Sequence, residues 1–199
     1  MTQPGAPAAL QGYRLQALYA LRRIFASAAD GTQIFCPEGK EDLDIQDQTG
    51  QLVEVVQVKS YSSLALSDLE PEKADSFFHR VSNLLRAVIP PIIKLVNFGA
   101  IGPELWQAWE GSEKQRKHII TKLTEKGFQK TDVEEFFDHV QLVSLDANQE
   151  REAVLSQIQS LSTGIDPQNA FDLFVAWYYR LAEQRQTVTC VELIDKINT

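Results

Sequence analysis

The chain has 199 residues, of which 44% are hydrophobic, and its 19 basic and 27 acidic residues give a formal net charge of −8. This length is sufficient for one domain with a buried core, and the acidic balance excludes nucleic-acid binding through bulk positive charge. Cys36 and Cys190 lie far apart and form no CxxC motif, so we expect neither a disulfide framework nor a zinc ribbon. No apolar run approaches the ~20 residues of a membrane span, and we expect a cytoplasmic protein.

The first segment, residues 1–11, is rich in Pro, Gly and Ala and is predicted to be a flexible arm without a signal peptide. From Tyr13 to Ala28 apolar residues recur at helical spacing, which predicts an amphipathic helix packed on a sheet. Gln16 lies near the edge of this apolar stripe.

A β-hairpin is predicted between Glu38 and Lys59. Residues 41–45 alternate polar and apolar, residues 46–51 form a polar turn with a glycine, and residues 52–58 are rich in β-branched side chains. Because side chains alternate along a strand, Asp42 and Asp44 share one face of the first strand, and Gln57 and Lys59 share one face of the second strand. Pairing of the strands can bring these four side chains together.

Carboxylates, a side-chain oxygen and an ammonium group on adjacent strands suit a hard divalent cation and a group that orients water. The alternative is that Asp42, Asp44 and Lys59 are solvated strand-end residues without a ligand. Alternation alone does not decide which aspartate is the principal ligand.

Two further strands are predicted. Residues 92–98 are nearly all apolar, which is typical of a strand buried on both faces, and residues 140–145 alternate. Between them, residues 112–130 form the most basic segment, which nominates Lys114, Arg116, Lys117 and Lys122 for phosphate contacts. A solvated helix face is the alternative.

The remainder, residues 147–199, is predicted to be helical throughout. Its central helix, residues 166–184, is rich in aromatic residues and needs a partner surface on this chain or on another copy. We divide the chain into an arm (1–11), a core (12–146) and a helical C-terminal extension (147–199). We also expect it to be the N-terminal part of a longer protein with further C-terminal domains, such as a sensor or an NTPase.

The hairpin and its surroundings resemble a known family. Residues 12–17 open a helix, Glu38 precedes Asp42 and Asp44, and Gln57-Val58-Lys59 closes the hairpin. This order resembles the QXK variant of the PD-(D/E)XK signature. It resembles in particular the double-stranded DNA endonuclease domain of bacterial anti-phage effectors, including CBASS effectors and some STAND NTPases.

The resemblance implies an α/β fold, with a restriction-endonuclease-like mixed sheet of about five strands flanked by helices. It implies a Mg²⁺-dependent endonuclease, with Mn²⁺ as a substitute, acting on double-stranded DNA as a homo-oligomer. Asp42, Asp44, Gln57 and Glu38 would hold the metal, Lys59 would activate water, and Gln16 would point at the site. The alternative function is a catalytically silent interaction or oligomerisation module with the same fold.

Overall fold

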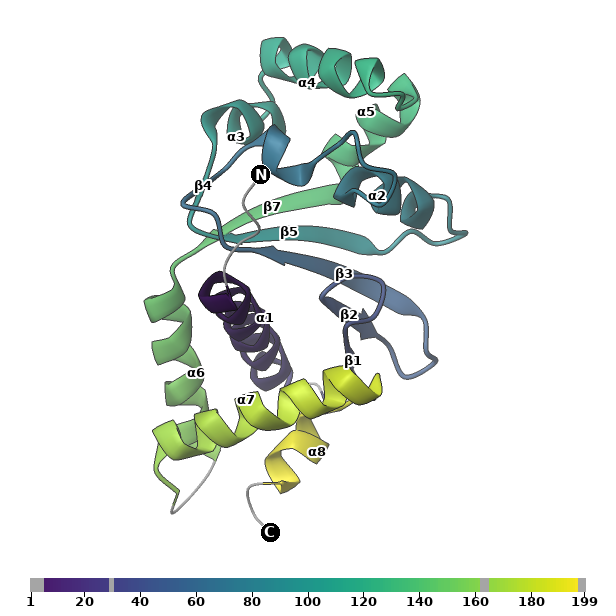
Figure 1. Cartoon of the computed structure of the whole chain (residues 1–199). Coiled ribbons are helices and arrows are strands. Elements are labelled where there is room, and N and C mark those ends of the chain that lie inside the picture. Colours follow the sequence, from purple (N-terminus) through teal and green to yellow (C-terminus); the bar gives the residue numbers. More distant parts are fainter. Residues whose placement is uncertain (1–5, 29–30, 162–164, 197–199) are drawn as a thin grey trace.

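A five-stranded mixed sheet lies at the centre of the molecule, with helices on both faces (Figure 1). The computed structural model describes residues 6–28, 31–161 and 165–196. The strands of this sheet are β1 (Ile34–Pro37), β2 (Leu43–Gln46), β3 (Leu52–Lys59), β5 (Ile92–Phe98) and β7 (Val140–Leu145). They lie in the order β1-β2-β3-β5-β7, antiparallel from β1 to β3 and parallel from β3 to β7.

Helices and short elements connect the strands. The helices are α1 (Ala6–Ala26), α2 (Phe77–Leu85), α3 (Pro103–Trp109), α4 (Glu113–Glu125), α5 (Lys130–His139), α6 (Ala147–Leu161), α7 (Pro167–Gln184) and α8 (Cys190–Asp195). A 3₁₀ turn, η1 (Leu66–Leu69), and a small parallel pair of strands, β4 (Ser63–Leu64) and β6 (Ala100–Ile101), complete the described elements.

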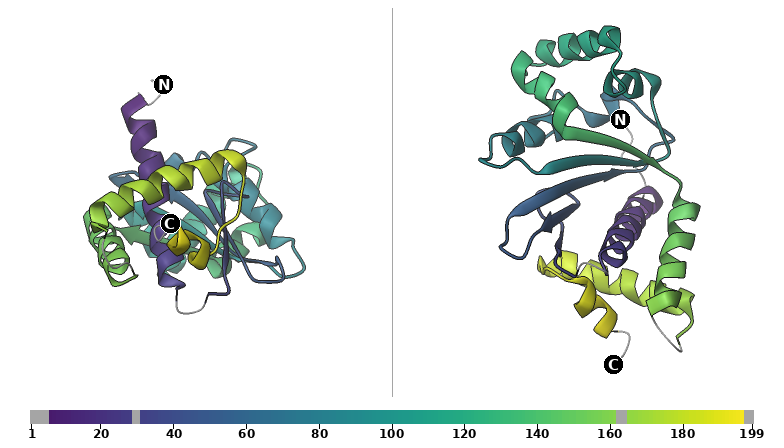
Figure 2. Two further views of the ribbon diagram at one scale, coloured as in Figure 1. Left: turned by 90° about the horizontal axis from the view of Figure 1, so that it is seen from below. Right: turned by 180° about the vertical axis from the view of Figure 1, so that it is seen from behind.

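The sheet separates two hydrophobic cores. One core joins α1, α6, α7 and α8 to one face, and the other joins α2 to α5 to the opposite face. The right-hand view of Figure 2 shows these two groups of helices on either side of the sheet. Strand β5 contributes Ile93 and Leu95 to the second core and Val96 to the first. This alternation explains why its sequence is apolar almost throughout.

The predicted α/β class, the five-stranded mixed sheet and the helical C-terminal part are confirmed, whereas the restriction-endonuclease-like arrangement is not confirmed. Helix α1 already begins at Ala6, inside the range predicted to be an arm, and residues 1–5 lie outside the described part. The division into core and extension stays a prediction.

The aromatic helix α7 finds its partner within this chain, because Phe174 and Tyr178 are buried in the core formed with α1. Phe25 of α1 packs edge-on against Phe174, with the ring centroids 5.1 Å apart. Among the described helices, none combines the length and apolar character needed to cross a membrane.

Candidate functional site

The candidate site is centred on Asp42, where β2 begins beside the end of β3. Leu43 lies opposite Val56, and this register places Asp42 next to Gln57. The Oδ2 atom of Asp42 accepts a hydrogen bond from the backbone N–H of Val58 at 2.6 Å and another from Nε2 of Gln57. The Gln16 side chain of α1 also hydrogen-bonds to this carboxylate. The hairpin and α1 therefore converge on Asp42, as predicted for Gln16, Asp42 and Gln57.

Arg80 of α2 joins the same network from the other face of the sheet. Its Nε and Nη2 atoms donate to the two carboxylate oxygens of Glu41, at 2.5 and 2.9 Å. Nη2 also donates to Oε1 of Gln57 at 2.9 Å. Gln57 thus bridges Asp42 and Arg80. No sequence pattern points to Arg80, because it lies 39 residues from Glu41 and residue spacing does not pair the two.

Asp44 does not join this cluster. Its carboxylate accepts hydrogen bonds from the backbone N–H groups of Lys40, at 2.7 Å, and Glu41, at 3.4 Å. A Cβ atom at Gly39 would lie 2.3 Å from Oδ2 of Asp44, so only glycine allows this close approach. Asp44 therefore holds the loop between β1 and β2 in place.

Glu38 lies in that loop, close enough to Asp42 for the charge of Asp42 to act on its carboxylate. Its backbone has φ of +53°, a conformation that non-glycine residues rarely adopt, and its N–H donates to the carbonyl of Asp42 at 3.1 Å. Burial and the negative charge of Asp42 both raise the pKa of Glu38. Within the described residues no hydrogen bond or ion pair reaches the Glu38 carboxylate.

Lys59 ends β3 on the other side of Asp42. Its positive charge lowers the pKa of Asp42, but burial dominates and the pKa of Asp42 is raised overall. The pKa of Glu41 is raised by burial too, against the lowering effects of Arg80 and Lys59. No carboxylate of the described chain lies within ion-pair distance of the Lys59 ammonium. Lys59 and Arg80 line a small cavity of about 150 Å³ with Lys73.

The residues of this cluster only partly match the predicted set of metal ligands. The described chain contains no group of three or more His, Cys, Asp and Glu side chains that could hold a metal. Asp42 and Glu38 are two carboxylates close enough for the charge of one to raise the pKa of the other, and oxygen ligands of this kind suit Mg²⁺ or Mn²⁺. Gln57 presents its nitrogen to Asp42 and its oxygen to Arg80, so it orients Asp42 and does not offer a free oxygen.

The predicted phosphate-binding residues lie elsewhere. Helix α4 is at the far end of the molecule, separated from β2 by the other strands of the sheet (Figure 1). Arg116 donates to the carbonyl of Ala108 at 2.8 Å, and Lys122 pairs with Glu104 at 2.9 Å. Lys114 and Lys117 are exposed on this distant helix. The structure therefore does not bring the basic segment to the Asp42 cluster.

Comparisons with known proteins show similarity in structure only. No protein-family model matches the sequence, and no curated protein matches it. The chain is similar to a Cap4 SAVED/CARF-domain containing receptor of Acinetobacter baumannii with the cyclic trinucleotide 3′3′3′-cAAA (TM-score 0.63, 14% identity, 94% of this chain and 44% of that chain). It is also similar to the Cap4 receptor of Moraxella osloensis (TM-score 0.56, 18% identity, 90% of this chain and 45% of that chain).

These identities show a shared fold, and the chain spans less than half the length of either receptor. Both proteins are described as SAVED/CARF-domain receptors and not as nucleases. This finding overturns the assignment to the PD-(D/E)XK family and the predicted Mg²⁺-dependent endonuclease acting on double-stranded DNA. The physical reason for the error is that Asp, Gln and Lys at the open end of a hairpin form a short pattern, which a binding site can share with a nuclease.

Proposed function

We propose that this chain is one module of a nucleotide-responsive receptor, whose Asp42 cluster binds the phosphodiester group of an oligonucleotide together with a divalent cation. The observation that carries the proposal is the pairing of Asp42 and Glu38. The Glu38 backbone N–H donates to the Asp42 carbonyl, the negative charge of Asp42 raises the pKa of Glu38, and burial raises the pKa of both carboxylates. Beside them, Lys59 has no ion-pair partner among the described side chains.

A divalent cation would relieve the repulsion between the two carboxylates. Asp42 and Glu38 would supply oxygen ligands to Mg²⁺, with Mn²⁺ as a substitute, and Gln57 would keep Asp42 oriented through its hydrogen bond. The cation supplies positive charge that a phosphodiester oxygen can contact directly. The proposal also places this chain in the cytoplasm, as part of a larger protein with further C-terminal domains.

The phosphate itself would lie toward Lys59 and Arg80. These residues line a small cavity of about 150 Å³ together with Lys73 and the acidic residues Asp68, Glu70 and Asp75, and Lys73 pairs with Glu70 at 2.7 Å. Lys59 offers a free point charge, whereas Arg80 is already held by Glu41 and Gln57. Lys59 is therefore the residue expected to contribute most to anion binding.

The test is calorimetric titration, first of Mn²⁺ and then of a cyclic triadenylate with and without Mn²⁺. The wild-type chain should bind Mn²⁺, and Mn²⁺ should strengthen nucleotide binding. Lys59→Met should lower the affinity for the nucleotide about tenfold, which is the order of one charge-assisted contact, and should leave Mn²⁺ binding unchanged. Lys114→Met, which alters an exposed lysine in the first turn of α4, is the matched control. Absence of Mn²⁺ binding in the wild type would contradict the proposal.

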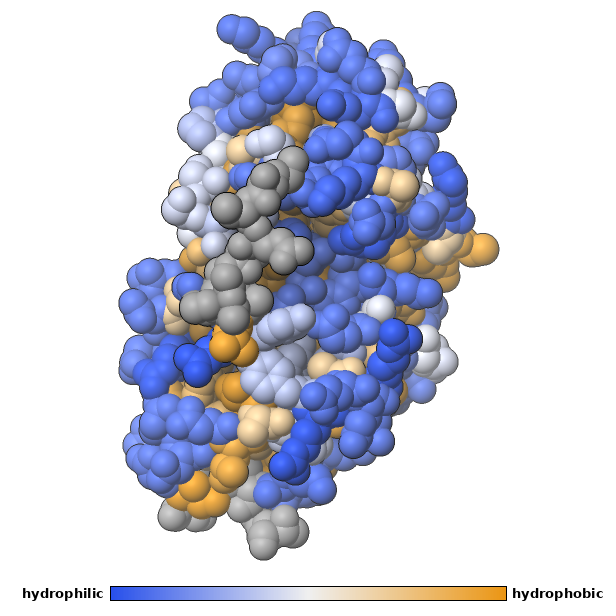
Figure 3. Space-filling view, in the orientation of Figure 1, coloured by the Kyte–Doolittle hydropathy of each residue, from blue (hydrophilic) through white to orange (hydrophobic). Residues whose placement is uncertain are grey.

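A second candidate function is association between copies of this chain. Val88, Ile89 and Ile92 form an apolar tip between α2 and β5, with exposed fractions of 101%, 59% and 48%. The space-filling view shows this tip projecting at one edge of the molecule (Figure 3). If copies associate through it, Ile89→Asp should lower the molar mass measured by light scattering at high concentration, and an unchanged mass would exclude this surface.

A further inference from the structure

A separate pocket of about 620 Å³ lies beside the Asp42 cluster, between α1 and α7. Its lining combines aromatic rings with charged and amide groups: Leu10, Tyr13, Arg14, Gln16, Glu38, Tyr178, Tyr179, Ala182 and Glu183. A volume of this size is within the range of small-molecule sites, roughly 300–1,000 Å³. Nothing derived above assigns it a ligand.

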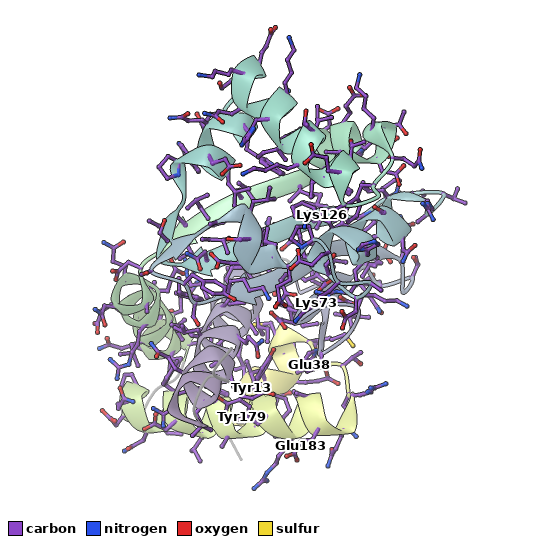
Figure 4. All side chains as sticks on the ribbon, turned by 45° about the horizontal axis from the view of Figure 1, so that its top comes forward. Tyr13, Glu38, Lys73, Lys126, Tyr179 and Glu183 are labelled. Atoms are coloured by element: carbon purple, nitrogen blue, oxygen red, sulfur yellow. The ribbon has the colours of Figure 1, made fainter. Side chains whose placement is uncertain are left out.

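The pocket presents flat apolar surfaces at its open side. Tyr13 is 52% exposed, and its ring contacts no other aromatic ring of the described chain. Tyr179 lies on α7 at the same pocket, and Tyr13 and Tyr179 appear close together where the two helices cross (Figure 4). Exposed tyrosine rings of this kind are the surfaces on which nucleobases stack.

The polar groups of the pocket include both acceptors and donors: two carboxylates, the Gln16 amide, three tyrosine hydroxyls and the Arg14 guanidinium. Glu38 and Glu183 contribute carboxylates on either side of the tyrosines (Figure 4), and Arg14 is the one cation of the described lining. Carboxylates accept hydrogen bonds from exocyclic amines, whereas the carbonyl edge of uracil or thymine would be repelled by them.

The pocket is continuous with the Asp42 cluster through shared side chains. Gln16 lines the pocket and hydrogen-bonds to the Asp42 carboxylate. Tyr178 lines it too, and its hydroxyl donates to the carbonyl of Asp42 at 3.3 Å. Glu38 belongs to both sites. A ligand with its phosphodiester at Asp42 would therefore reach this pocket with the adjoining nucleoside.

We propose that this pocket binds a nucleobase that carries an exocyclic amine, such as adenine, from the oligonucleotide whose phosphodiester lies at Asp42. The base stacks on Tyr13 and Tyr179, and Glu38 or Glu183 accepts a hydrogen bond from the amine. This inference rests on the proposed function, because it concerns the nucleoside attached to that phosphodiester.

The experiment compares three probes in the presence of Mn²⁺: the dinucleotide ApA, the dinucleotide UpU, and an abasic diribose joined by the same phosphodiester. ApA should bind about tenfold more tightly than the abasic probe, the order of one stacked base. Tyr13→Leu should bring ApA down to the affinity of the abasic probe. Trp106→Leu, which alters an aromatic residue that is 43% exposed on α3, is the matched control and should change nothing.

The outcomes separate this inference from the proposed function. Mn²⁺-dependent binding of the abasic probe with the same affinity as ApA would overturn the base pocket and leave the phosphodiester site standing. Equal affinities for ApA and UpU would overturn recognition of the amine. Failure of every probe to bind in an Mn²⁺-dependent manner would overturn both proposals.

Discussion

Glu38 offers a test in which stability and cation binding should change in opposite directions. Its backbone has φ of +53°, and the negative charge of Asp42 raises the pKa of its carboxylate. A left-handed conformation costs a non-glycine residue about 1–2 kcal/mol. Glycine adopts it without this cost but loses about 0.5–1 kcal/mol more conformational entropy on folding. The substitution Glu38→Gly should therefore raise the free energy of unfolding by about 0.5–1 kcal/mol, and it also removes the repulsion from Asp42.

The assay is thermal and urea unfolding combined with Mn²⁺ titration. For a chain of this size, 1 kcal/mol corresponds to a rise in melting temperature of about 2–4 °C. The same variant should lose Mn²⁺ affinity, because one of the two carboxylates is gone. If Glu38 is held in this conformation for function, Glu38→Gly should show higher stability and lower Mn²⁺ affinity together.

Arg185 provides the matched control for the backbone effect. It ends α7 with φ of +49° and lies outside the Asp42 cluster. Arg185→Gly should stabilise the chain by a similar amount without changing Mn²⁺ binding. The reasoning is refuted if Glu38→Gly lowers the melting temperature, or if it binds Mn²⁺ as tightly as the wild type.

The remaining predictions concern the two aspartates. Asp44→Ala should destabilise the chain by about 1–2 kcal/mol, because the N–H groups of Lys40 and Glu41 lose their acceptor. The same variant should leave Mn²⁺ affinity almost unchanged. Loss of Mn²⁺ binding at wild-type stability would instead make Asp44 the cation ligand. The pKa values of Asp42 and Glu38 are raised in the folded chain. Stability should therefore fall as pH rises from about 4 through these raised values, because the folded state holds protons that the unfolded state has released. Mn²⁺ affinity should rise over the same interval, since protons compete for the carboxylates. Urea unfolding and calorimetry between about pH 4 and 7 measure both trends. Asp42→Asn should make both trends shallower, while Glu38, Glu41 and Asp44, whose pKa values are also raised, still contribute.

Much of the sheet could be predicted because its signals are local. The hairpin follows from period-two alternation on either side of a polar turn, and β5 and β7 have the bounds expected from their apolar patterns. The pair β4 and β6 could not be predicted, because strands of two residues carry no periodicity. The early start of α1 was missed because Pro7 and the alanines around it were interpreted as an arm, although proline is tolerated in the first turn of a helix.

The sequence could predict that Asp42, Asp44 and Gln57 lie near one another, but not that the two aspartates have different hydrogen-bond partners. Alternation places both on one face of β2, but the loop at Gly39 folds back and uses Asp44 as its hydrogen-bond acceptor. This difference depends on a close contact between backbone and side chain, which residue spacing does not encode. The role of Arg80 is likewise non-local, because it depends on how α2 packs against the hairpin.

The position of the Asp42 cluster gives a physical reason why a ligand there could influence the whole module. Gln16 comes from α1, on one face of the sheet, and Arg80 comes from α2, on the other. Gln57 lies between them and hydrogen-bonds to both Asp42 and Arg80. A cation bound to Asp42 would weaken the hold of that carboxylate on Gln57 and, through Gln57, the position of Arg80. Ligand binding at Asp42 would therefore act on side chains from α1 and α2 at once and would bias how these helices sit against the sheet.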